Sequence, residues 1–199
     1  MGKIVISQNV TLDGVVEDPT GEEGFKHGGW WVQVASIDRE GFYQAALDEV
    51  LHAEALLFGR RTYEYFAARW PSRTGELADR MNGIPKYVVS STLADPGWGN
   101  STVVTGDAVR EVSKLKERLA GEIVVPGSLQ LVRALLGNDL ADELRLLVYP
   151  YALGDGERLF GEMPDKLSLR LIGNRTVGDG LPHLTYQVVR PAEGAAADS

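Results

Sequence analysis

One short stretch decides the fold that this sequence predicts: Leu56-Leu57-Phe58-Gly59-Arg60-Arg61-Thr62-Tyr63-Glu64. The apolar run 55–58 is typical of a strand that is buried on both faces of a sheet. Gly59 permits a sharp turn, or a close approach of the backbone to a ligand. Thr62 is a candidate cap for a helix that begins at once, with Glu64 near its positive end. The stretch therefore predicts a buried strand that turns directly into a helix.

Arg60 and Arg61 place two fixed positive charges beside the start of that predicted helix. Free backbone N–H groups, the helix dipole and two guanidinium groups together favour the binding of a phosphate. An isolated pair of arginines at a turn is more often simply solvated. Two further turns at strand ends look similar, at Ser90-Ser91-Thr92 and at Pro126-Gly127-Ser128, and they favour the phosphate interpretation.

The composition fits one globular domain, with 199 residues, a net charge of −8 and 44% hydrophobic residues. The acidic balance argues against nucleic acid or an anionic membrane as a partner. There is no cysteine, which excludes disulfides and thiol chemistry. His27, His52 and His183 lack the spacing of metal ligands, so no metal is expected. Neither a membrane-spanning run nor a secretory pattern is seen, and we expect a cytoplasmic protein.

Hydrophobic patterns predict strands that alternate with helices, followed by a strand-rich C-terminal part. Strands are expected at 3–10, 55–58, 86–90, 101–105, 122–125, 144–150, 168–177 and 184–189. Helices are expected at 38–52, from 60 to about 70, and at 76–82, 108–119 and 129–136. This order predicts an α/β fold with a mainly parallel central sheet, flanked by helices and closed by an antiparallel C-terminal hairpin. We expect a single domain over residues 1–190 and a disordered tail at 191–199.

A long Gly-rich, acidic loop is predicted from residue 15 to about residue 37. A loop of that length is typical of a lid or a binding loop. Trp30 and Trp31 lie in it and either stack on a flat ligand or pin the loop to the core. The sequence leaves both roles open.

The three turns lie at the carboxyl ends of predicted parallel strands, which is where ligands bind in open α/β sheets. We therefore expect them to share one cleft. The hydroxyl groups of Ser90, Ser91 and Thr92 suit a phosphate or a ribose, although ordinary turn chemistry explains them equally well.

Six motifs occur in an order and at a spacing typical of one superfamily. They are Thr11-Leu12-Asp13-Gly14, the run 59–64, Ser90-Ser91-Thr92, Gly127-Ser128 with Leu131, Asp142-Glu143-Leu144, and Leu153-Gly154-x-Gly156 with Leu159-Phe160. Over residues 3–189 the chain resembles the dihydrofolate reductase superfamily. More closely, it resembles the reductase domain of the riboflavin-biosynthesis deaminase-reductase.

The resemblance implies an NADPH-dependent oxidoreductase that transfers hydride to a pteridine- or aminopyrimidine-like heterocycle, as phosphoribosylaminouracil reductases and dihydrofolate reductases do. It implies that the cofactor-binding residues form four groups. Gln8 and Asn9 approach the nicotinamide, and Gly127, Ser128 and Leu129 hold the pyrophosphate. The adenosine-side phosphates meet Gly59, Arg60, Arg61 and Thr62, and the adenine end lies near Ser90, Ser91 and Thr92. The loop from Gly14 to Trp31 corresponds to the family's mobile lid. The resemblance also implies a homodimer.

The chain departs from the family pattern in three places. Pro126-Gly127 stands where two adjacent glycines are usual, so one backbone donor is lost. Folate reductases hold the pterin with a carboxylate on the first helix, but the matching stretch 42–44 has no acid. Asp48 and Glu49 follow one turn later and are predicted to face solvent, which argues against true dihydrofolate reduction. The deaminase half is absent, because a zinc deaminase needs cysteine ligands.

Asp13, at the mouth of the first strand, is the candidate catalytic residue that orients the substrate or relays a proton. The alternative is a turn aspartate that binds its own backbone. Asn9 either offers its amide to the edge of the substrate ring or is a satisfied polar group, and Trp30 and Trp31 are the candidates for stacking. A non-catalytic nucleotide- or pterin-binding protein remains the competing function. A kinase is disfavoured, because no G-x-x-x-x-G-K-[ST] motif is present.

Overall fold

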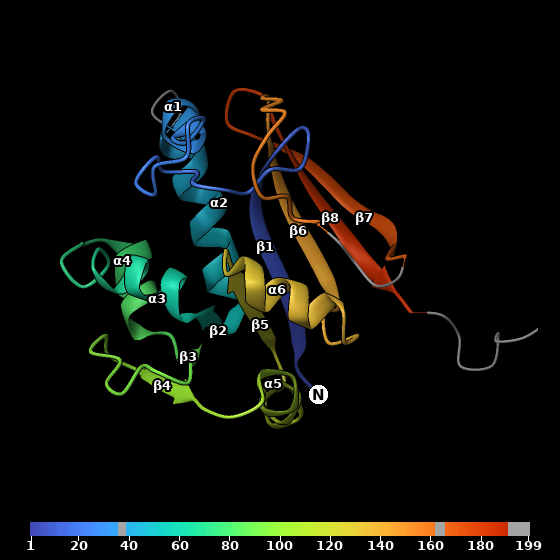
Figure 1. Ribbon diagram of the computed structural model, residues 1–199. Helices are drawn as coiled ribbons and strands as arrows, with labels where there is room; N and C mark the ends of the chain where they lie inside the picture. The colour runs from blue at the N-terminus through green and yellow to red at the C-terminus, as the bar shows by residue number, and fades with distance from the viewer. Residues whose placement is uncertain (36–38, 162–165, 191–199) are drawn as a thin grey trace, which may run out of the picture.

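The computed structural model describes residues 1–35, 39–161 and 166–190. Eight strands form one sheet in the order β4-β3-β2-β5-β1-β6-β8-β7 (Figure 1). The strands are β1 (Lys3–Thr11), β2 (Ala53–Gly59), β3 (Lys86–Val89), β4 (Ser101–Val104), β5 (Glu122–Pro126), β6 (Glu143–Tyr149), β7 (Ser168–Val177) and β8 (Leu181–Val189). The strands from β4 to β6 in this order pair in parallel, whereas β8 pairs antiparallel to both β6 and β7. The predicted fold class is confirmed.

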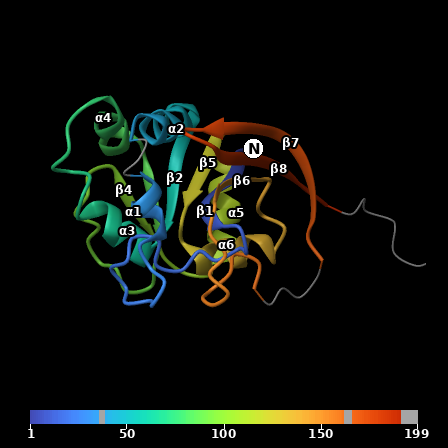
Figure 2. The same ribbon diagram turned by 90° about the horizontal axis from the view of Figure 1, so that it is seen from above.

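Helices cover both faces of this sheet. They are α1 (Trp30–Ala35), α2 (Arg39–His52), α3 (Arg60–Ala67), α4 (Glu76–Gly83), α5 (Ala108–Arg118) and α6 (Leu129–Leu136). One core cluster joins α5 and α6 to the sheet, and a second joins α2, α3 and α4 to the opposite face. The pair β7 and β8 lies at one edge of the molecule, with β3 and β4 towards the other (Figure 2). Within the described ranges, no helix is long and apolar enough to cross a membrane.

Side chains of β1 alternate between these two layers. Ile4 and Ile6 pack in the cluster of α5 and α6, whereas Val5 packs in the cluster of α2, α3 and α4. Because successive side chains of a strand point to opposite faces, Ser7 and Asn9 share the face of Val5. This alternation decides which residues of β1 face α2.

The loop predicted at 15–37 contains more structure than the sequence indicates. A short helix, α1, begins at Trp30, and the buried Asp18 carboxylate accepts hydrogen bonds from the N–H groups of Glu23 and Phe25, each at 3.1 Å. Gly21 and Gly29 donate to the Asp18 carbonyl, at 3.1 and 3.0 Å. The loop is therefore folded around one buried acid. Residues 36–38, where the next helix was predicted to begin, and the predicted tail at 191–199 lie outside the described residues.

Trp30 pins this loop to the core. It is 2% exposed, its Nε1 donates to the Glu17 carbonyl at 3.0 Å, and its ring meets the Tyr149 ring edge-on at 5.1 Å. Of the two roles open in the sequence, Trp30 therefore takes the structural one. In α2, Leu47 and Val50 are buried, whereas Leu51 is 49% exposed.

Candidate functional site

A cleft of about 2120 Å³ opens at the carboxyl ends of β1, β2, β3 and β5. The twelve residues predicted to bind the cofactor all line it: Gln8, Asn9, Gly59, Arg60, Arg61, Thr62, Ser90, Ser91, Thr92, Gly127, Ser128 and Leu129. These residues come from turns that are far apart in the sequence. The parallel sheet gathers them because its strands end at the same edge.

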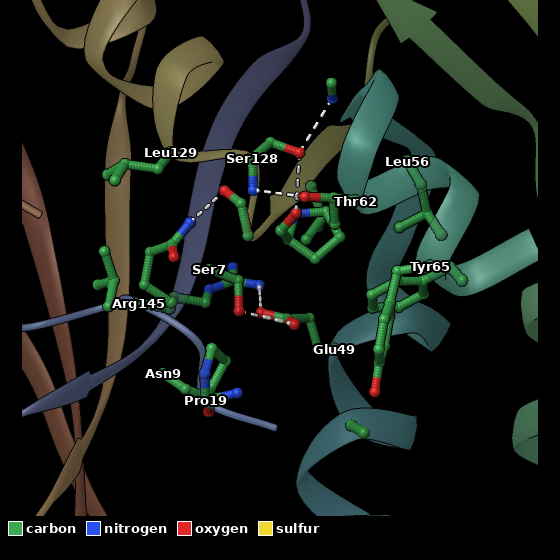
Figure 3. Close-up of a pocket in the computed structure, with 18 of the residues that line it drawn as sticks. Ser7, Asn9, Pro19, Glu49, Leu56, Thr62, Tyr65, Ser128, Leu129 and Arg145 are labelled. Carbon is green, nitrogen blue, oxygen red and sulfur yellow. Dashed lines mark hydrogen bonds and ion pairs between the residues drawn. The ribbon is translucent and has the colours of Figure 1, made fainter. Parts of the chain in front are cut away.

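Two of the turns are bonded to each other by their hydroxyl groups (Figure 3). The Gly59 N–H donates to Ser128 Oγ at 2.9 Å, and the Ser128 N–H donates to Thr62 Oγ1 at 3.0 Å. The prediction that Thr62 caps its own helix is wrong, because Thr62 lies inside α3 and Gly59 is the N-cap. Ser128 does occupy the N-cap position of α6, but its hydroxyl bonds to the other turn and not to its own helix. We call this pair of bonds the turn clip.

The conformation of the turn at residues 126–128 explains why a glycine is needed at position 127. Gly127 and Ser128 both have a positive φ of 58°. A Cβ on Gly127 would lie 3.1 Å from Thr62 Cγ2, so a side chain would push the two turns apart. Pro126 ends β5 in register with Ser7, and the Gly127 N–H donates to the Ser7 carbonyl at 3.3 Å. The turn itself is thus intact despite the proline.

The cleft has donors that fit the phosphates of a dinucleotide. The first N–H groups of α3 and α6 have no partner within their own helices, and both helices begin in the cleft. Arg61 is paired with Glu23 at 3.0 Å and Arg60 with Glu64 at 4.0 Å, but these side chains are about half exposed or more. Exposed pairs contribute only about 0–1 kcal/mol, so a phosphate can displace the carboxylates.

The hydroxyl groups after β3 divide into two kinds. Ser90 Oγ accepts from the N–H groups of Thr92 and Leu93, at 3.2 and 3.0 Å, which is the turn chemistry that the sequence left open. Ser91 and Thr92 are exposed at the rim of the cleft. Ser91 and Thr92 are therefore the residues of this turn that a ligand can reach from solvent.

Gln8 and Asn9 point to opposite faces of β1. Gln8 is buried, and its Nε2 donates to the Gly127 carbonyl, so it supports the turn at residues 126–128. Asn9 shares the face of Ser7, and its Oδ1 lies 3.5 Å from the Tyr149 hydroxyl. Asn9 is therefore the better placed of the two to meet a ring in the cleft.

Asp13 lies in a turn away from this site. Among the residues that the structure describes, neither Asp13 nor Trp30 lines the cleft, whereas Trp31 does. The Asp13 carboxylate accepts from Thr11 Oγ1 at 2.7 Å and from the Gly154 N–H at 2.8 Å. The Thr11 hydrogen bond is the main cause that lowers the pKa of Asp13 to about 2. A carboxylate so firmly ionised fits the turn role, and we assign it no proton transfer.

Glu49 is a cleft residue that the sequence analysis missed. The prediction that it faces solvent is wrong, because Ser7 Oγ donates to Glu49 Oε2 at 2.9 Å and the side chain is 20% exposed (Figure 3). Burial raises the pKa of this carboxyl above the usual 4.5, against the opposing effects of the Ser7 hydrogen bond and Arg145. Polar and apolar residues are spread almost evenly around α2, so periodicity could not assign its faces.

Comparison with known proteins places the chain in a family. The family model described as the RibD C-terminal domain matches residues 2–182, so the chain belongs to the RibD C-terminal domain family. The uncharacterized protein YyaP of Bacillus subtilis is 26% identical over 190 residues, which cover 92% of this chain and 94% of YyaP.

Solved structures agree on the fold. A Shewanella sp. PV-4 protein, named provisionally as a riboflavin biosynthesis protein, aligns with a TM-score of 0.70 and 24% identity over 94% of this chain and 99% of its own. A dihydrofolate reductase from Enterococcus faecalis, solved with NADP(H), aligns with a TM-score of 0.56 and 13% identity over 94% and 96% of the two chains. The predicted membership of the dihydrofolate reductase superfamily is confirmed.

The turn clip can be tested with Thr62→Val, which keeps the shape of the side chain but removes the acceptor of the Ser128 N–H. Because the Ser128 N–H is only part-buried, we expect the loss of its acceptor to lower the free energy of unfolding, measured in urea, by about 1 kcal/mol. Thr102→Val, at an exposed position of β4, is the matched control. Equal and small changes in the two variants would show that the clip does not hold the turns.

Proposed function

We propose that this protein is an NADPH-dependent reductase that transfers hydride to a pteridine- or aminopyrimidine-like heterocycle. One observation supports this most: the clipped turns start α3 and α6 side by side in one cleft, next to Arg60 and Arg61. Such an arrangement suits a dinucleotide whose phosphates meet two helix N-termini. Membership of the RibD C-terminal domain family supports the same function.

The residues divide the cleft into two ends. Arg60, Arg61 and the helix N-termini would hold the phosphates, and Ser91 and Thr92 would lie near the adenine end. The nicotinamide would then lie towards β1, where it supplies a hydride when bound. This leaves the space beside Glu49 and Asn9, in the cleft that Trp31 also lines, for the acceptor heterocycle.

A non-catalytic nucleotide- or pterin-binding protein is the competing proposal. It is favoured by Pro126 and by the clip itself, since the N–H groups of Gly59 and Ser128 are used internally. The missing helix carboxylate no longer supports it, because Glu49 lines the cleft. This proposal requires cofactor binding with no turnover, so oxidation of NADPH with any member of a panel of pteridines and aminopyrimidines would exclude it.

NADPH binding is tested by thermal unfolding with NADPH, with NADH and without ligand. At about a hundred times the dissociation constant, a ligand adds roughly 2.7 kcal/mol to the free energy of unfolding, so NADPH should raise the Tm by several degrees. Arg61→Ala should weaken NADPH binding by about 10- to 150-fold, because a charge-assisted hydrogen bond contributes about 1.5–3 kcal/mol. Arg110→Ala, exposed on α5, is the control. An unchanged Tm with both cofactors would refute the proposed function.

We also propose that two copies of the chain associate through the edge of the sheet. The edge strand β7 exposes Leu171 and Ile172, which are 47% and 52% accessible, and Val189 of β8 is 41% accessible. An exposed apolar edge strand offers unpaired backbone groups to a second strand. Sedimentation equilibrium should give a dimer for the wild type and a monomer for Ile172→Lys. A monomeric wild type at micromolar concentration would contradict this proposal.

A further inference from the structure

The guanidinium group of Arg145 has one nitrogen whose donors are free. Its Nε donates to Glu143 at 2.8 Å, and its Nη2 donates to both Glu122 oxygens, at 2.9 and 2.8 Å. Its Nη1 makes no hydrogen bond with the residues that the structure describes, because its ion-pair partner Glu49 Oε1 lies 3.9 Å away, beyond hydrogen-bond distance. The N–H groups of Nη1 can therefore bind an acceptor from outside the protein.

This nitrogen is accessible from the cleft. Arg145 lines the cleft, and its side chain extends from β6 across β1 towards Glu49 (Figure 3). Among the described residues, Arg133 Nε is the only side-chain nitrogen or oxygen that is buried without a hydrogen-bond partner. Nη1 of Arg145 has no such partner and is not in that class, so it is open to a ligand.

The guanidinium is held in place on its other two sides. The carboxylates that bind it are themselves fixed by Lys3, whose Nζ lies 2.6 Å from Glu143 and 3.3 Å from Glu122. The strands also align these residues, with Lys3 opposite Glu122 and Ser7 opposite Arg145. A donor that is fixed before the ligand arrives loses little entropy on binding, so this arrangement favours recognition of a ligand atom at one position.

The charges around Arg145 indicate which kind of atom it binds. Glu122 and Glu143 balance the positive charges of Lys3 and Arg145, and the Glu49 carboxyl adjoins the same group. No excess of positive charge remains here, so a phosphate or a carboxylate is disfavoured. A neutral carbonyl oxygen accepts a strong hydrogen bond from a guanidinium and adds no charge.

The neighbouring side chains leave a place for a flat ring. Ser7 and Asn9 lie on one face of β1, and Asn9 stands opposite Leu147 of β6. Leu147 lines the cleft and is two residues, or about 7 Å, further along β6 than Arg145. A ring that lies against Leu147 can thus meet the Asn9 amide and direct one edge at Arg145.

We propose that Arg145 is a substrate-binding residue that recognises a ring carbonyl oxygen of the acceptor heterocycle through the N–H groups of Nη1. The inference rests on the proposed function and narrows its substrate class to oxo-substituted pyrimidines or pteridines. A ring with an amino group in place of the oxygen would set N–H groups against N–H groups. Both sets of donors would then be left unpaired, which disfavours that ring.

Two matched compounds test this without turnover. 2-Amino-4-oxopteridine and 2,4-diaminopteridine differ in carrying an oxygen or an amino group at one position, and their binding is measured by isothermal titration calorimetry, without cofactor and with NADP⁺. The wild type should bind the oxo compound about 10- to 150-fold more tightly, because one partner of the hydrogen bond is charged. Equal affinities, tighter binding of the diamino compound, or binding of neither would overturn the proposal.

The variant Arg145→Lys assigns the preference to this residue. It keeps a positive charge beside Glu122 and Glu143 but removes Nη1, so the preference for the oxo compound should disappear. A purely structural role would weaken both compounds equally and leave the ratio of their affinities unchanged, which would overturn the proposal. Arg170→Lys, exposed on β7, is the matched control. The comparison of the two compounds with the wild type needs no variant, so it decides even where Arg145→Lys does not fold.

Cofactor binding separates this inference from the proposed function. Arg145→Lys should keep the rise in Tm that NADPH causes in the wild type. Loss of that rise in a folded variant would assign Nη1 to the carboxamide oxygen of the nicotinamide and overturn the proposal. A wild type that prefers the oxo compound but binds no NADPH would refute the proposed function and leave the role of Arg145 in place.

Discussion

Two hydrogen bonds join the turn that begins α3, at residues 59–62, to the turn that begins α6, at residues 126–128. These bonds determine the shape of the cleft. The parallel pairing of β2 with β5 extends to Leu56 and Val124, and beyond this point hydroxyl groups join the two segments. The Gly59 N–H reaches Ser128, and the Ser128 N–H reaches Thr62. As a result, α3 and α6 start side by side at the same edge of the sheet. A neutral side-chain hydrogen bond contributes only about 1 kcal/mol, so the clip fixes geometry more than it adds stability.

The opposite end of the cleft depends on unbalanced charge. The carboxyl groups of Glu49, Glu122 and Glu143 share two cations, Lys3 and Arg145, below α2, and the shorter contacts of both cations are with Glu122 and Glu143. Replacing such a cluster with apolar residues is often neutral or stabilising in proteins, so its presence in a covered sheet calls for a functional reason. Glu49, whose pKa is raised by burial, is a member of this cluster that lines the cleft beside Ser7. The two ends of the cleft thus differ, with two helix N-termini and two arginines at one and a charged cluster at the other.

Much of the fold follows from local patterns in the sequence. The apolar run before Gly59 and the small residues after β5 predicted strand-to-helix turns, and parallel strands then place those turns at one edge whatever the details of packing. Side-chain partners could not be predicted in the same way. Thr62 and Ser128 have the residue types of helix caps, yet each bonds across to the other turn, which depends on a contact between residues 66 positions apart. Glu49 was missed because α2 has no clear apolar face. The role of Asp13 in its turn could not be predicted, because it depends on a hydrogen bond from Gly154, which is far away in the sequence, as well as one from Thr11.

The most direct test is a crystal structure of the protein grown with NADP⁺ and solved to a resolution at which the two ends of the dinucleotide are distinct. The account predicts the pyrophosphate at the first N–H groups of α3 and α6, the adenine near Ser91 and Thr92, and the nicotinamide beside β1, with Glu49 facing the open side of its ring. Density for the dinucleotide in the reverse direction, or with its nicotinamide far from Glu49 and Asn9, would contradict it.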